Sequence, residues 1–272
     1  MIDENVFREQ LLTDLGYRTP DVVKRGFWFR LLGRTDFMYN LAVLGIVLRG
    51  GRLARSGAWS RASWLNLSLD MARTVEGCGG KFEITGAEHI AALKGPAIIV
   101  ANHMSLLETF AIPSILLPFQ DLTFVVKESL MRTPFIKDVM MGSRPISVGR
   151  ENPREDFQLL IEKGSEVIAE GRSLVIFPQS TRSVTFIPSS FNSVGAKLAK
   201  RTGVPLLPLA LKTDFQGLGK VFRDFGPIDR SKTVRFKFGP AVSATGTGRE
   251  ANEHCIRFIG ETLRGWGGLV AE

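Results

Sequence analysis

From residue 79 onward, apolar residues form short runs separated by longer segments in which they recur every three or four positions. Short β-branched runs, such as the one in "GPAIIVANH", are typical of strands that are buried on both faces. Longer segments, such as "REDFQLLIEKGSEVIAEG", have the periodicity of helices. Strands that alternate with helices predict an α/β fold with a mostly parallel sheet flanked by helices.

The predicted elements follow one another to the end of the chain. We expect strands within "GKFEIT", "GPAIIVANH", "LTFVVK", "RPISVG", "SLVIFP", "PLLPLALK" and "TVRFKFG". We expect helices at 105–117 and 135–141 and within "REDFQLLIEKGSEVIAEG", "FNSVGAKLAKRTG" and "REANEHCIRFIGETLRG". In such a sheet, ligands collect at the carboxyl ends of the strands. His103 and Arg182 follow two of these ends.

Residues 1–78 have a different pattern. Aromatic and apolar residues are interleaved with basic ones, and they lead into the apolar stretch "FMYNLAVLGIVL", which is shorter than the roughly 20 residues needed to span a bilayer. A second amphipathic segment, "AWSRASWLNLSLDMARTVEG", follows a Gly-Gly and Ser-Gly break. The pattern predicts an N-terminal helical hairpin that precedes an αβ domain at 79–272. The apolar faces either enter a membrane surface or pack on that domain, and these residues alone leave both interpretations open.

The charge of the chain suggests an anionic partner. Its 35 basic and 27 acidic residues give a formal net charge of +8, and nine of the basic residues lie between Arg18 and Arg61. Membranes, nucleic acids and phosphorylated substrates all fit such a charge. The basic residues stand among apolar ones and no nucleic-acid reader motif is present. We therefore expect an anionic phospholipid membrane as partner and no nucleic acid.

The cysteine content and the first residues of the chain indicate the cellular compartment of the protein. The two cysteines, Cys78 and Cys255, have no metal-ligand spacing, so we expect no metal site and a reducing environment. The start "MIDENVFREQLLTDLG" does not resemble a secretory signal. The expected location is the cytoplasmic face of the inner (cell) membrane, with peripheral or monotopic attachment.

The stretch "NHMSLLE" has two interpretations. Ser105 and Glu108 have the spacing of a capping box, which satisfies the free amides of a helix start. A histidine beside a carboxylate is also the arrangement that deprotonates a hydroxyl. Positions five apart lie about 140° around a helix axis, so His103 and Glu108 can meet only if His103 precedes the helix. No GxSxG nucleophile elbow is present, which favours direct transfer over an acyl-enzyme intermediate.

The stretch "VIFPQSTRS" is either a solvated loop after a strand or a turn that holds a phosphate. In the second interpretation Ser180, Thr181 and backbone amides form the turn, and Arg182 supplies a charged, bidentate contact. Lys127 and Arg150 lie near other predicted strand ends and add positive charge there. A serine hydrolase that uses Ser180 or Ser105 would need a triad, and His89 and His254 have no such context.

The order of these pieces resembles a known family. "NHMSLLE", "KESLMRTPFIKDVMMGSRPISVGR", "FPQSTRS" and "VPLLPLALKTDF" are similar, block for block, to the 1-acylglycerol-3-phosphate acyltransferase family of glycerolipid acyltransferases. The resemblance implies that His103 is the general base, Glu108 its carboxylate partner and Arg182 the phosphate ligand, with help from Lys127 and Arg150. It also implies a membrane-docked helical pair at the N-terminus. It further implies a lysophospholipid acceptor and a thioester donor, either acyl-CoA or acyl carrier protein, without a cofactor.

The chain departs from the family pattern at two places. Glu108 replaces the commoner aspartate, and the longer side chain still reaches a histidine that precedes the helix. Gln179 and Ser180 replace the usual Glu-Gly, which removes a carboxylate beside the expected phosphate site and restricts the backbone. Another lysophospholipid or an ornithine-lipid precursor therefore stays open as acceptor, and so does a catalytically inactive lipid-binding protein.

Overall fold

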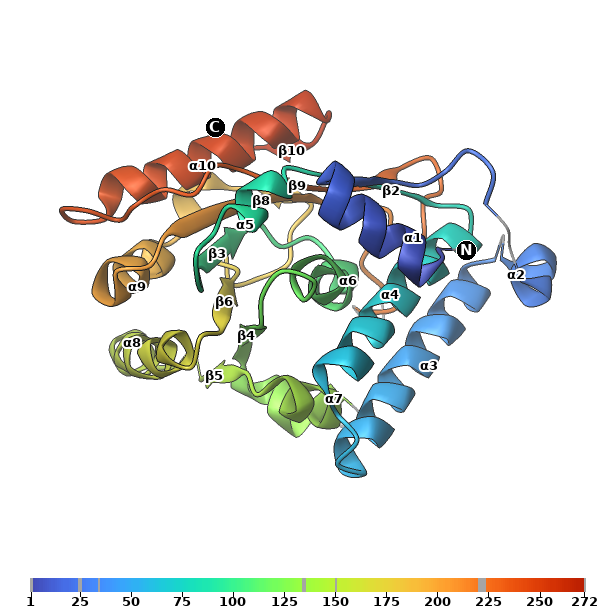
Figure 1. Ribbon diagram of the computed structural model, residues 1–272, viewed down its shortest axis with the longest axis horizontal. Coiled ribbons are helices and arrows are strands. Elements are labelled where there is room, and N and C mark those ends of the chain that lie inside the picture. The colour runs from blue at the N-terminus through green and yellow to red at the C-terminus, as the bar shows by residue number, and fades with distance from the viewer. Residues whose placement is uncertain are drawn as a thin grey trace.

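A mixed sheet forms the centre of the molecule (Figure 1). The computed structural model describes residues 2–23, 26–33, 35–133, 136–149, 151–219 and 224–271. Within these ranges the strand order is β1-β2-β9-β8-β3-β6-β4-β5, and only the β1–β2 and β8–β9 pairs are antiparallel. The prediction of an α/β fold with a mostly parallel sheet flanked by helices is confirmed.

The strands of this sheet are short, and the helices cover both of its faces. The strands are β1 (Tyr17–Arg18), β2 (Lys81–Thr85), β3 (Ile98–Ala101), β4 (Leu122–Lys127), β5 (Ile146–Val148), β6 (Ser173–Ile176), β8 (Leu206–Lys212) and β9 (Thr233–Phe238). A separate parallel pair consists of β7 (Thr185–Phe186) and β10 (Leu269–Val270). The helices are α1 (Glu4–Glu9), α2 (Phe27–Leu32), α3 (Asp36–Arg55), α4 (Arg61–Gly77), α5 (Glu88–Ala91), α6 (Leu106–Leu116), α7 (Ile136–Ser143), α8 (Pro153–Ala169), α9 (Val194–Thr202) and α10 (Arg249–Gly265).

Two hydrophobic cores lie on opposite faces of the sheet. The first packs side chains of α3, α4, α6 and α7 against one face, and the second packs α8, α9 and α10 against the other. Every residue of β3 and β6 is buried, which explains why their sequences are apolar at consecutive positions rather than alternating. These two strands are neighbours near the middle of the sheet, so their carboxyl ends bring His103 and the "FPQSTRS" loop together.

The N-terminal segment differs in detail from the expected hairpin. Helices α3 and α4 do lie side by side (Figure 1), but α2 is a separate short helix, and Gly50 and Gly51 lie inside α3 instead of breaking it. A Cβ on Gly50 would be 3.1 Å from Val139 and 3.3 Å from Leu67, so this glycine serves close packing of α3 on α7 and α4. The turn comes later, at residues 56–60.

The start of the chain joins the same core. Strand β1 pairs with β2, and the hydroxyls of Tyr17 and Thr19 each donate a 2.7 Å hydrogen bond to the buried Glu76 in α4. Neither α1 nor β1 was expected from the pattern. The division of the chain near residue 78 stays a prediction. Within the described ranges, no helix has both the length and the apolarity that crossing a membrane requires.

Candidate active site

His103 and Glu108 form a direct pair at the carboxyl end of β3. The Nδ1 atom of His103 is 2.8 Å from Oε1 of Glu108. His103 lies in the turn before α6 and Glu108 in its first turn, which is the arrangement that lets residues five apart meet. Glu108 is fully buried, whereas the side chain of His103 keeps 16% of its surface exposed. The carboxylate therefore belongs to the interior and the imidazole reaches the surface of a cavity.

Hydrogen bonds surround the carboxylate of Glu108. It accepts from the backbone amide of Met104 (2.6 Å), from the amide and hydroxyl of Ser105 (2.9 and 2.7 Å) and from the hydroxyl of Thr213. Burial opposes ionisation, but the contacts with His103, Thr213 and Ser105 outweigh it and hold the pKa of Glu108 below its ordinary value. A negative charge is thus kept behind the imidazole, where it stabilises the imidazolium form.

The geometry of "NHMSLLE" is compatible with both of its interpretations, as a helix cap and as a catalytic pair. Ser105 is the N-cap of α6 and Glu108 occupies the third helical position, where its carboxylate accepts the Ser105 amide. The same carboxylate binds His103. Because Ser105 is buried and its hydroxyl donates to Glu108, it is not a nucleophile. The amides of Met104 and Ser105 are likewise used inside the turn, so neither is available to a reacting oxyanion.

Further contacts hold the ring of His103 and the turn that carries it. Its ring stacks on Phe177, with centroids 4.1 Å apart, and its carbonyl accepts from the amide of Ser183. The side chain of the preceding Asn102 donates to the carbonyl of Leu211 and accepts from its amide, each at 2.8 Å. The turn is thereby anchored to both neighbouring strands. Nδ1 is engaged by Glu108, so Nε2 is the nitrogen that faces the cavity.

A cavity of about 1140 Å³ opens beside His103. It passes over the carboxyl edge of the sheet and reaches both faces. On one face its walls come from the first core, including Phe110, Phe124 and Met140, and on the other from the second core, including Leu160 and Val194. The part lined by the first core is called here the first arm and the part lined by the second core the second arm, and His103, after β3, lines the same cavity.

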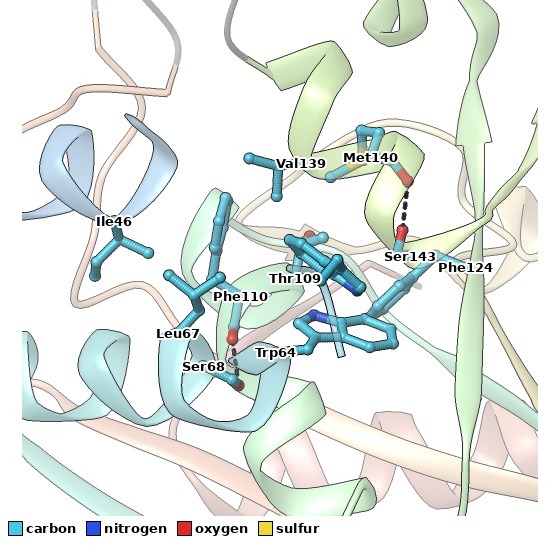
Figure 2. A pocket seen from close by; sticks show the side chains of 11 residues that line it. Ile46, Trp64, Leu67, Ser68, Thr109, Phe110, Phe124, Val139, Met140 and Ser143 are labelled. Carbon is cyan, nitrogen blue, oxygen red and sulfur yellow. Dashed lines mark hydrogen bonds between the residues drawn. The ribbon is translucent and has the colours of Figure 1, made fainter. Parts of the chain in front are cut away.

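The wall of the first arm contains a second, much smaller cavity (Figure 2). It measures about 20 Å³ and shares Thr109, Phe110, Phe124 and Met140 with the large cavity. Trp64 and Phe124 meet edge to face in its wall, with ring centroids 6.3 Å apart, and Ser68 donates to the carbonyl of Phe110. The arm on the side of α3 and α7 thus ends in an apolar, aromatic wall.

Arg182 lines the same cavity, but it is not free. Its guanidinium is paired with the carboxylate of Asp224, and both side chains are mostly covered. The amide side chain of Gln216 donates to the carbonyl of Asp224 (2.8 Å), which holds this residue in place. Lys127, at the end of β4, also lines the cavity and is exposed to it. The structure thus brings two of the predicted cations to the cavity of His103.

The other predicted phosphate ligands differ from expectation. Ser180 and Thr181 line the cavity, yet their amides donate to the carbonyls of Phe177 and Gln179 within the loop. The backbone amides of Ser180 and Thr181 are therefore engaged within the loop, and the phosphate-holding role of this turn stays a prediction. Ser180 has a φ of 63°, the left-handed conformation that glycine adopts without strain. Arg150 lies outside the described residues.

Sequence reasoning missed three residues of the site: Thr213, Phe177 and Asp224. Thr213 and Phe177 lie inside stretches that drew attention for other reasons, "VPLLPLALKTDF" and "VIFPQSTRS". Their contacts with Glu108 and His103 depend on the register of β8 and β6 against β3, which a single sequence does not give. Asp224 carried no signal in the sequence.

Comparison with known proteins gives consistent results. Residues 81–212 match the family model described as Acyltransferase. A 1-acyl-sn-glycerol-3-phosphate acyltransferase of Pseudomonas aeruginosa is 28% identical over 205 residues, which cover 74% of this chain and 75% of that protein. The enzyme of the same name from Borreliella burgdorferi is 33% identical over 139 residues, 49% of this chain and 52% of its own length.

A solved structure shares the fold. The crystal structure of the 1-acyl-sn-glycerophosphate (LPA) acyltransferase from Thermotoga maritima superposes with a TM-score of 0.61 and 22% sequence identity, covering 84% of this chain and 96% of that one. At this identity the likeness concerns the fold. Together with the family match and the curated relatives, it confirms the resemblance expected from the sequence blocks. Residues 81–212 thus carry an Acyltransferase domain, and the relatives that share this region are 1-acyl-sn-glycerol-3-phosphate acyltransferases.

Proposed function

We propose that this acyltransferase moves a fatty acyl group from a thioester to the free hydroxyl of 1-acylglycerol 3-phosphate, which yields phosphatidic acid. The observation that carries the proposal is the His103–Glu108 pair, which opens onto a cavity that Arg182 and Lys127 also line. A base and two cations around one cavity suit an acceptor that bears a hydroxyl and a phosphate. The names of the relatives support the same acceptor.

In the proposed reaction, Nε2 of His103 takes the proton of the acceptor hydroxyl while its oxygen attacks the thioester carbonyl. The tetrahedral intermediate then collapses, the C–S bond breaks, and the imidazolium returns the proton to the leaving thiolate. Glu108 keeps Nδ1–H in place and stabilises the imidazolium between these two steps. No metal or cofactor takes part in these proposed steps, and acyl-CoA or acyl carrier protein serves as donor.

The cavity supports a division of roles along its length. Its apolar arm, between α3, α6 and α7, suits the acyl chain, because its walls are aliphatic and aromatic. Arg182 and Lys127 suit the phosphate of the acceptor. Asp224 offsets part of the positive charge that Arg182 offers to that phosphate, since its carboxylate is paired with the guanidinium.

Asp224 also favours a second candidate acceptor. An acidic side chain beside Arg182 gives the subsite both signs of charge, and Gln179 and Ser180 stand in the same loop in place of the family's Glu-Gly. Another lysophospholipid or an ornithine-lipid precursor would meet such a subsite with an amino group as well as an anionic group. The two candidates differ in the acceptor and share the base.

The N-terminal helices support attachment to a membrane. Phe27, Trp28 and Leu31 of α2 and Phe37 of α3 are each more than half exposed, with values of 71, 62, 62 and 67%. Arg30 of α2 makes no ion pair within the described ranges, whereas Arg49, Arg55 and Arg61 pair with carboxylates of this chain. We propose that the face of α2 and the start of α3 docks on the anionic surface of the inner membrane, on its cytoplasmic side.

Thiol release from acyl-CoA, or turnover of acyl carrier protein, tests the acyl transfer. Wild-type protein is expected to release thiol only when lysophosphatidate is present, and His103→Ala is expected to lose about 10²–10⁴-fold in rate. His89→Ala is the matched control, since this histidine lies in α5 away from the cavity. Equal rates for the wild type and His103→Ala would refute the proposal, and a preference for an amino-bearing lysolipid would establish the second acceptor.

Vesicle flotation tests the docking surface. Trp28→Glu combined with Leu31→Glu is expected to abolish binding to anionic vesicles, because two exposed apolar side chains of α2 become charged. Leu269→Glu is the control, since Leu269 is similarly exposed (59%) but lies in β10 beside α10. Undiminished flotation of the double variant would show that α2 does not dock.

A further inference from the structure

The second arm of the large cavity has no role in the acceptor binding described above. It lies between the N-terminal turns of α8 and α9, and its walls include Phe157, Leu160 and Val194. Asp156, Asn192, Ser193 and Lys197 add polar groups. The arm is thus amphipathic, in contrast to the aromatic end of the first arm. It opens to the same His103 from the opposite face of the sheet.

A thioester needs a passage of this kind. Its carbonyl must lie beside Nε2 of His103, with the acyl chain on one side of the carbonyl carbon and the thiol-bearing chain on the other. If the acyl chain occupies the apolar arm, the thiol-bearing chain has to leave His103 in another direction. The arm between α8 and α9 provides that direction, because the cavity crosses the edge of the sheet.

Close contacts join the two helices that form this arm, α8 and α9, to each other and to the sheet. A Cβ on Gly164 of α8 would be 2.5 Å from Leu198 of α9, and one on Gly195 would be 2.5 Å from Val100 of β3. The two helices are therefore in close contact with each other beyond the arm, and α9 is seated directly on the sheet. Asn192 ties the start of α9 to the "FPQSTRS" loop through the carbonyl of Pro178, at 2.7 Å. These contacts fix how α8, α9 and the loop lie beside the opening.

Lys197 provides a cation at this arm. Its Nζ lies 5.1 Å from the ring centroid of Phe157, which orients the ammonium group across the opening. Within the described ranges Lys197 makes no ion pair with a carboxylate, in contrast to Arg182. Its positive charge is available to an anionic group at the outer end of an occupant.

We propose that this arm, here called the donor arm (Phe157, Leu160, Asn192, Ser193, Val194 and Lys197), binds the phosphopantetheine chain of the acyl donor, with Lys197 on its phosphate. Phosphopantetheine combines aliphatic segments, two amides and a terminal phosphate, which matches apolar walls, polar side chains and a cation in one groove. The inference rests on the proposed acyl transfer from a thioester. Coenzyme A and acyl carrier protein share this chain, so the donor arm serves either of them.

Binding of coenzyme A and of 4′-phosphopantetheine, measured by calorimetry on the full chain without turnover, tests the donor arm. Lys197→Glu is expected to raise the Kd of both by about tenfold or more, since a charge-assisted contact becomes a repulsion. Lys200→Glu is the matched control, because Lys200 is exposed on the same helix but does not line the cavity. In steady-state assays, Lys197→Glu is expected to raise the KM of palmitoyl-CoA by the same factor and to leave the KM of the acceptor unchanged.

The outcomes separate the donor arm from the proposed function. Unchanged Kd and KM values in Lys197→Glu would overturn the donor arm even if acyl transfer is observed, and so would a wild-type protein that binds neither probe. A Kd that depends on Lys197 but not on Lys200, without any acyl transfer, would support the donor arm and reject the proposed reaction. Weaker binding of coenzyme A but not of 4′-phosphopantetheine would overturn the assignment of Lys197 to the shared phosphate.

Discussion

The hydroxyl of Thr213, just after β8, donates a hydrogen bond to the carboxylate of Glu108 in the first turn of α6, 105 positions earlier in the chain. The same hydroxyl is 3.0 Å from that of Ser105. Glu108 therefore accepts hydrogen bonds both from the start of its own helix and from the residue that follows β8. This double attachment fixes the carboxylate that contacts His103, and it makes Thr213 a positioning residue if His103 is the base, as proposed.

Thr213→Val tests this role. We expect kcat to fall about tenfold, since a less well-placed base gives up part of the roughly 10²–10⁴-fold contribution of general-base catalysis. Urea unfolding is expected to show a loss of about 1.5–3 kcal/mol, because a hydrogen bond to a buried charged group is removed. Thr74→Val is the control: Thr74 is also buried, but its hydroxyl donates to a carbonyl of its own helix. An unchanged kcat in Thr213→Val would remove Thr213 from the catalytic arrangement.

Glu108 makes the stability of the fold depend on pH. Its pKa in the folded protein lies below the ordinary value of 4.5, so its contribution to stability is complete above that pH and is lost as the pH falls through the folded value. The difference in unfolding free energy between the wild type and Glu108→Gln should be largest near neutral pH and shrink below pH 4.5. Denaturant titrations at several pH values measure it. A difference that grows towards acid pH would contradict the inferred direction of the pKa shift.

Ser180 carries a conformational cost that a glycine would remove. A left-handed backbone costs a non-glycine residue about 1–2 kcal/mol, of which the added flexibility of glycine in the unfolded chain cancels about 0.5–1. Ser180→Gly should therefore raise the unfolding free energy by about 0.5–1 kcal/mol, as measured by urea titration. Ser190→Gly, at a residue whose φ is not positive, should lower it instead. Destabilisation by Ser180→Gly would mean that the serine side chain contributes more than the strain costs.

Asp224 competes with the acceptor phosphate for Arg182. Asp224→Asn removes the charge but keeps the shape of the side chain, so we expect the KM of lysophosphatidate to fall about two- to fivefold, the range of a partly exposed ion pair. Inorganic phosphate should also become a better inhibitor. Asp214→Asn is the control, because Asp214 pairs with Lys212 and Lys232 and does not line the cavity. A higher KM in Asp224→Asn would show that Asp224 positions Arg182 or holds an amino group of the acceptor.

Local patterns in the sequence were sufficient for most of the fold. Strand β3 is apolar throughout and β6 is apolar after Ser173, and α8 has clear helical periodicity, so both kinds of element were predicted close to their observed bounds. The glycines of α3 misled the prediction because a glycine that admits a neighbouring helix looks the same in sequence as one that breaks a helix. Strand β1 consists of two residues, too few to give an alternating pattern.

The site was predictable where its parts are close in sequence. His103 and Glu108 lie within one turn and its helix, and local geometry alone required His103 to precede α6. Thr213 and Asp224 reach the site through strand order and a long loop, and neither is fixed by nearby residues. Which backbone amides of the "FPQSTRS" turn are free was not predictable, because the bonds from the Ser180 and Thr181 amides to Phe177 and Gln179 depend on a turn geometry that the sequence does not specify.

The two hydrogen bonds between the side chain of Asn102 and the backbone of Leu211 also determine when the active site can form during synthesis. Because the side chain of Asn102 bonds to both backbone groups of Leu211, the turn that holds His103 is anchored only after β8 has been made and has paired with β3. Thr213 follows two residues later. A nascent chain that ends before residue 206 thus contains the histidine, the glutamate and the helix, but lacks the strand that aligns them. Competence for acyl transfer arises late in translation, when the sheet closes around β8.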